Sequence, residues 1–136
     1  MLLPICFNNR RGEGARLVIT VFARRLGFCE EEDSNLVQLR GTLCKPPNLR
    51  TTPMGRDICD LMLAVNRRYG RSDYLPCICW GLAARQAAGW AVGDRVQLSG
   101  RLQSRRYIKL TEEGAVEKTA FEVSAAEIAT DAEPLF

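Results

Sequence analysis

Between residues 35 and 128 the chain consists of short runs in which apolar and polar residues alternate, separated by residues typical of turns. Alternation with a period of two is the pattern of a β-strand, because successive side chains of a strand point to opposite faces of the sheet. We therefore predict five strands. They cover 35–45, Asp57–Asn66, Tyr74–Trp80, 95–110 and a run through Phe121, Val123 and Ala125.

The residues between these runs support the same division. Pro46 and Pro47 end the first strand, because proline has no N–H to donate to a neighbouring strand. Gly70 and Gly114 mark the connections before the third and the fifth strand. The alanine-rich residues 81–94 carry apolar side chains at helical spacing, which predicts one short helix.

Five strands with one helix between the third and the fourth is the order of elements in the OB-fold. We predict an all-β fold of this type, a five-stranded Greek-key barrel. A different five-stranded barrel or sandwich is the alternative, because the number of strands does not set their topology.

The predicted third strand raises a question about function, because it carries two large aromatic residues on one face. In the stretch SDYLPCICWG, Tyr74 and Trp80 are six residues apart and share a side. Leu75, Cys77 and Cys79 share the other side and are small and apolar enough to face the core. The aromatic rings would then point towards solvent or a partner. Trp90, on the apolar stripe of the predicted helix, is expected in the core.

Length and composition indicate one soluble globular domain, since 136 residues with 46% hydrophobic and 26% charged residues suffice for a sizeable core. Residues 1–34 differ from the rest and are expected to form a poorly ordered N-terminal extension, with 17–28 as a short strand or an amphipathic helix. The run Glu30–Glu32 is what a purine-rich ribosome-binding site would encode if read through, which would place the natural start near Asp33. Residues 129–136 form a short acidic tail.

Charge is distributed unevenly along the chain. Residues 36–128 hold fourteen basic against nine acidic residues, a net charge of +5, while the last eight residues carry only two acids. Such a balance permits binding to a polyanion but does not prove it, because a modest basic excess is common.

Six cysteines and the lack of histidine bear on metal and redox chemistry. Their spacing follows no disulfide scheme or paired zinc motif, so we expect reduced core thiols, with no metal and no cofactor. A zinc site built from Cys44, Cys59, Cys77 and Cys79 is a minor alternative. A redox or nucleotide-hydrolysing enzyme is disfavoured, because CxxC and phosphate-loop motifs are missing from the sequence. No apolar run reaches the 18–20 residues needed to span a bilayer, and we expect no membrane association and a cytoplasmic, nucleoid-associated protein.

Three motifs in order resemble the bacterial single-stranded DNA-binding proteins, across about Asn35–Ile128. The first is a G-x-L-x-x-x-P-x-x-R-x-T-x-x-G pattern followed by LAVNR. The second is DYLPCICWGLAA, similar to the third strand and helix start of the family, and the third is VGDRVQLSGRLQSRRY, similar to its fourth strand. The first motif is carried by Gly41, Leu43, Pro47, Arg50, Thr52, Gly55 and Leu63 to Arg67.

The resemblance implies a non-enzymatic protein that binds single-stranded DNA without sequence specificity in replication, recombination and repair. Such proteins stack bases on exposed aromatic rings and neutralise phosphates with basic side chains. The stacking positions of the family fall on Tyr69, Tyr74, Trp80 and Tyr107. Phosphate contacts are expected from the basic residues that flank them, which are Arg67, Arg68, Arg71, Arg101, Arg105, Arg106 and Lys109. For each ring, packing in the core or in a dimer interface is the alternative.

The resemblance also implies a homotetramer, with a dimer possible. Two departures from the family matter. The connection between the second and third strands is short, which would reduce the length of DNA wrapped per subunit, and we expect the long flexible linker of well-known members to be lacking, which affects partner recruitment. The tail only approximates the acidic tip of the family, so a frayed end is as good an interpretation as a site for replication and repair proteins. An accessory primosomal or plasmid OB-fold protein is the nearest alternative function. The tail residues concerned are Asp131, Glu133, Pro134, Leu135 and Phe136.

Overall fold

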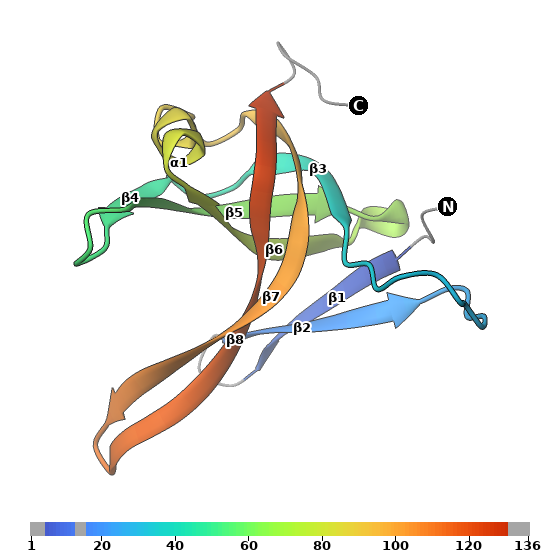
Figure 1. Ribbon diagram of the computed structural model, residues 1–136, viewed down its shortest axis with the longest axis horizontal. Coiled ribbons are helices and arrows are strands. Elements are labelled where there is room, and N and C mark those ends of the chain that lie inside the picture. The colour runs from blue at the N-terminus through green and yellow to red at the C-terminus, as the bar shows by residue number, and fades with distance from the viewer. Residues whose placement is uncertain (1–4, 13–15, 131–136) are drawn as a thin grey trace.

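The computed structural model describes residues 5–12 and 16–130, with side chains from Val18 onward. Strands dominate it, and one short α-helix and one 3-10 turn interrupt them (Figure 1). In chain order the elements are β1 (Ile5–Gly12), β2 (Arg16–Ala23), β3 (Val37–Leu43), β4 (Asn48–Thr51), β5 (Asp57–Asn66), a 3-10 turn (Arg68–Gly70), β6 (Ser72–Trp80), α1 (Leu82–Ala87), β7 (Arg95–Thr111) and β8 (Gly114–Thr130).

Five strands close into a barrel. Strand β3 pairs antiparallel with both β5 and β7, β5 pairs with β6, and β7 pairs with β8. The ring is completed by β6 and β8, which are parallel. With α1 between β6 and β7, this is the connectivity of the OB-fold, and it confirms the predicted five-stranded barrel. The short strand β4 pairs with the free edge of β5 and was not predicted.

The core of the barrel follows the alternation of the sequence. Leu39, Leu63, Leu75 and Leu98 each point inward and are buried, and a buried leucine contributes about 2 kcal/mol to stability. Trp90, which follows α1, packs against this cluster as predicted.

One residue on the outer face of β6 is buried. Ile78 shares that face with Tyr74 and Trp80, yet only 2% of it is exposed. Its neighbours in register are Asp60 on β5 and Ser124 on β8, so strands flank Ile78 on both sides. The middle of this face therefore offers little ring surface, and the exposed aromatic surface of β6 lies at its two ends.

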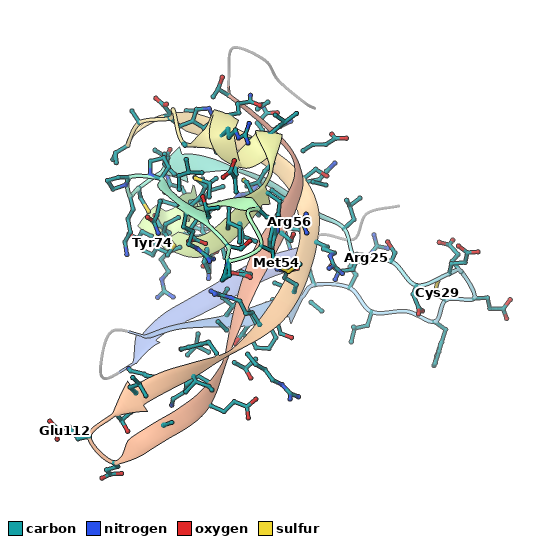
Figure 2. All side chains as sticks on the ribbon, turned by 60° about the vertical axis from the view of Figure 1, so that its left-hand side comes forward. Arg25, Cys29, Met54, Arg56, Tyr74 and Glu112 are labelled. Atoms are coloured by element: carbon teal, nitrogen blue, oxygen red, sulfur yellow. The ribbon has the colours of Figure 1, made fainter. Side chains whose placement is uncertain are left out.

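The hairpin of β7 and β8 continues beyond the barrel as a long twisted arm whose tip carries Glu112 (Figures 1 and 2). A bulge between Ser99 and Gly100 interrupts the regular pairing where the two strands pass along the barrel. Glycine is required there, because a Cβ atom on Gly100 would lie 1.9 Å from the carbonyl oxygen of Ser124. At the tip, Gly114 has a φ of 115°, a value that favours glycine.

Within residues 1–34, which we expected to be a poorly ordered extension, the structure describes a hairpin of β1 and β2. Of the two conformations considered for residues 17–28, the strand is the one found, from Arg16 to Ala23. Ile19 packs against the barrel core, whereas residues 24–36 are exposed and lead away from the barrel at Arg25 and Cys29 (Figure 2). The tail residues 131–136 lie outside the described part of the chain.

The cysteines of the described side chains are free thiols. Cys59, Cys77 and Cys79 are buried, and Cys59 faces Cys79 across the β5–β6 pair. Burial disfavours the thiolate, which raises the pKa of Cys77 and raises that of Cys79 to about 12. Within residues 18–130 no group of three potential metal ligands is gathered. In that same part of the chain, none of the helices is long and apolar enough to span a membrane.

Candidate functional site

The two aromatic residues of β6 lie at opposite ends of its outer face. Tyr74 is 38% exposed and is paired in register with Ala64. Trp80 is partly exposed and is paired with Ile58. Six residues of strand separate the two rings, a distance of about 20 Å, so each ring would contact a different nucleotide of a bound strand.

An arginine that sequence reasoning missed covers Trp80. The guanidinium carbon of Arg56 lies 5.0 Å from the centre of the indole ring, within the range of a cation–π contact. Arg56 belongs to the turn between β4 and β5, which also carries the exposed Met54 (Figure 2). The sequence holds a signal for this contact. A hairpin centred on Tyr69 places Ile58 opposite Trp80, and Arg56 precedes Ile58 by two residues, so Arg56 is expected near Trp80.

The connection between β5 and β6 presents Tyr69 to solvent. The ring is 97% exposed, and the backbone of Tyr69 is left-handed, with φ 69° and ψ 31°. Non-glycine residues seldom adopt this conformation, and it is often retained at functional sites. Arg68 and Arg71 flank the ring and are exposed as well, so cations and an aromatic surface stand side by side.

Arg67 has a different environment from its neighbours. Its Nε donates a hydrogen bond of 2.7 Å to Oδ2 of Asp73, and its Nη2 donates to Oδ1 of the same carboxylate. Asp73 is only 5% exposed, so this pair joins the ends of β5 and β6. The arrangement favours a structural role for Arg67 over the phosphate contact expected from the sequence.

A groove of about 700 Å³ lies between this connection and β3. Tyr69 and Asp73 are among the residues that line the groove. Apart from Asp73, the charged residues among its described lining residues are all arginines. One of them comes from the segment after β2, which sequence analysis did not connect with the site. The arginines of the groove are Arg24, Arg40, Arg67, Arg68 and Arg71.

The remaining candidate residues lie on the arm of β7 and β8. The register of these strands shows which face of the arm each residue occupies. Ser124 is paired with both Ile78 and Arg101, so the face of β7 that carries Arg101 continues the outer face of β6. Alternation adds Arg105, Tyr107 and Lys109 to the same face. All four side chains are exposed, and Tyr107 is 40% exposed.

Arg106 is on the opposite face of the arm from Arg105. Its Nη1 lies 3.7 Å from Oε1 of Glu117. The Nε of Arg105 lies 3.5 Å from Oε1 of the buried Glu122, which also accepts a hydrogen bond of 3.0 Å from Gln103. The structure therefore brings Arg105 to the proposed surface and separates Arg106 from it.

Comparison with known proteins places this geometry in a family. Residues 34–131 match the model of the single-strand binding protein family, which covers the whole barrel and the arm. The chain belongs to this family. The match includes the predicted stacking residues and all seven predicted phosphate contacts, and it begins after the β1–β2 hairpin.

Curated members of the family match the chain in an alignment of 80 positions, which covers 54% of the chain. Single-stranded DNA-binding protein 2 of Listeria innocua is 36% identical there, and protein B of Bacillus subtilis is 38% identical. The chain spans about half the length of the Listeria protein and 71% of the Bacillus protein.

A solved structure shows the same fold. The wild-type single-stranded DNA binding protein from Thermus aquaticus superposes on 97% of this chain and 59% of its own length. The TM-score is 0.77 at 24% sequence identity, so this likeness establishes the shared OB-fold.

Proposed function

We propose that this chain binds single-stranded DNA without sequence preference, in replication, recombination and repair. The observation that carries the proposal is one continuous outer face, on which Tyr74 and Trp80 of β6 are joined by Arg105 and Tyr107 of β7. Every base has a π-face and every nucleotide a phosphate, so rings interleaved with cations bind a strand irrespective of its sequence.

The proposed strand contacts two regions besides β6. At one end, Tyr69 with Arg68 and Arg71 forms an exposed platform beside the arginine-lined groove. The arm is the second region. Because β8 runs parallel to β6, the arm leaves the barrel on the side where β6 begins, and its basic face extends the path away from the barrel. Arg guanidinium groups suit both tasks, because they neutralise phosphate and stack on bases.

The rest of the proposal concerns assembly and partners. The protein acts by binding, without catalysis, as a homotetramer or alternatively a dimer in the cytoplasm. Residues 131–136 would recruit replication and repair proteins. Membership of the single-strand binding family supports these assignments, and light scattering of the purified chain would decide between the tetramer and the dimer.

Titration with oligo-dT tests the proposed function. The Trp80→Ala and Tyr74→Ala variants should each lose about 1–3 kcal/mol of binding free energy. Their melting temperatures should change little, because both rings are partly exposed on the outer face. Saturating DNA should quench Trp80 fluorescence, while Trp90, packed against the core, should respond little.

Two results would contradict the assignment. Wild-type protein that fails to bind oligo-dT would exclude the activity. Variants with normal affinity and sharply lowered melting temperatures would instead show that these rings serve the core, where removal of a large aromatic side chain costs about 3–5 kcal/mol of stability.

A further inference from the structure

The contact between Arg56 and Trp80 extends the site beyond the residues expected from the sequence. The guanidinium of Arg56 covers the indole at 5.0 Å, while Arg56 itself is exposed. A base that stacks on an indole needs a free ring face. The covered face can therefore accept either the guanidinium in direct contact or a base, but not both.

The backbone of Arg56 is held in place while its side chain can turn. Its N–H donates to Oγ1 of Thr52 at 3.1 Å, and its carbonyl accepts a hydrogen bond of 2.8 Å from the N–H of Thr52. Gly55, with a φ of 84°, completes the turn. A long side chain on a fixed backbone can leave the ring without any change in the fold.

The charge of Arg56 is available to an anion. The adjacent carboxylate of Asp57 already accepts hydrogen bonds from Arg85 and from Oγ1 of Thr51. Within the described residues no carboxylate lies in ion-pair distance of the Arg56 guanidinium. Arg56 therefore differs from Arg67, whose guanidinium is already paired with Asp73.

We propose that Arg56 is a DNA-contacting residue that covers Trp80 in the free protein, yields the ring to a base, and then pairs with the phosphate of that nucleotide. The direction of the exchange follows from the energies. A cation–π contact at an exposed site is weaker than a base stacked on an aromatic side chain. The displaced guanidinium gains a phosphate, so its charge stays neutralised. This inference rests on the proposed binding of single-stranded DNA.

The free protein provides the first test, which does not depend on DNA. The Trp90→Phe background leaves Trp80 as the only tryptophan, because the chain has two. In that background, Arg56→Ala should shift Trp80 emission and increase its quenching by acrylamide, since the covering group is removed. Unchanged emission and quenching would overturn the first half of the proposal.

Salt-dependent binding of oligo-dT provides the second test. Arg56→Ala should reduce the slope of log K against log salt by about 0.7, the value for one phosphate contact with a single strand. Affinity at low salt should fall about ten-fold. Arg56→Lys should keep the slope, because it keeps the charge. Arg95→Ala is the matched control: Arg95 is exposed at the start of β7, hydrogen-bonds to Thr42, and should leave slope and affinity unchanged.

A double-mutant cycle links Arg56 to Trp80. In the Trp80→Ala background, Arg56→Ala should cost less affinity than in the wild type, because both side chains act on one nucleotide. Wild-type binding together with an unaltered Arg56→Ala slope would overturn the assignment of Arg56 alone. A wild-type protein that does not bind oligo-dT would overturn the proposed function, and this inference with it.

Discussion

Arg67 and Asp73 form a two-point ion pair that joins the end of β5 to the start of β6. Asp73 is buried, so its carboxylate depends on Arg67 for compensation of its charge. Arg67 stands in sequence beside Arg68, yet the two residues differ in environment, because Arg67 is partly buried in its pair with Asp73 and Arg68 is exposed. The basic run therefore combines a structural arginine with arginines that face solvent.

Replacing Arg67 should damage stability more than DNA binding. Arg67→Ala leaves the Asp73 carboxylate buried without its partner and should lower the free energy of unfolding by about 2 kcal/mol. Arg68→Ala should leave stability unchanged and weaken binding to oligo-dT. Urea denaturation and DNA titration of both variants measure the two effects. Equal stability of the two variants would contradict a structural role for Arg67.

Replacing Tyr69 with glycine should raise the stability of the protein and lower its affinity for DNA. Its left-handed backbone is strained for a tyrosine, so Tyr69→Gly should raise the free energy of unfolding by about 0.5 kcal/mol. The same variant should lose about 1–3 kcal/mol of binding to oligo-dT, because the exposed ring is removed. Tyr69→Phe serves as the control and should retain both properties. If Tyr69→Gly bound DNA normally, the ring would not belong to the site.

Arg105 and Arg106 should differ although they are adjacent. Arg105 shares the face of Tyr107, so Arg105→Ala should reduce the slope of log K against log salt by about 0.7. Arg106→Ala should leave the slope nearly unchanged, because Arg106 lies on the other face near Glu117. Melting temperatures report any effect of Arg105→Ala on the buried Glu122, which keeps its hydrogen bond from Gln103. Equal slopes for both variants would mean that DNA contacts both faces of the arm.

Cys79 should make the protein sensitive to alkali. Burial raises its pKa from the ordinary 9.0 to about 12, so above pH 9 the unfolded chain loses this proton while the folded protein retains it. The unfolded state then binds fewer protons, and stability falls as pH rises from 9 towards 12. Below pH 9, Cys79→Ala should be less stable than the wild type, because a buried side chain is shortened. That deficit should narrow between pH 9 and 12, as followed by urea denaturation, and a constant deficit would argue against the raised pKa.

The sequence determined the strands and the direction of their faces. In β6, Leu75, Cys77 and Cys79 were predicted to face inward and are buried, because a period of two is a local property of an extended backbone. It also located α1 and the turn at Gly114. The motifs were specific enough to indicate the family, which the match over residues 34–131 confirms.

The alternation also held information that the prediction of phosphate contacts did not use. Arg105 and Arg106 are consecutive in a strand, so they must point to opposite faces. The basic residues were grouped by their distance from Tyr107 along the chain. The register of β8 with β6 and β7 then showed that the face of Arg105 and Tyr107 continues the outer face of β6.

Only the tertiary structure decided which side chains meet. The pairing of Arg67 with Asp73, the burial of Ile78 and the cover of Trp80 by Arg56 all depend on register between strands and on the path of a turn. Strand β4 and the β1–β2 hairpin likewise depend on a partner strand being present. The local sequence pattern predicts to which face of its own strand a side chain points. Its neighbours come from other segments of the chain, and the closure of the barrel brings those segments together.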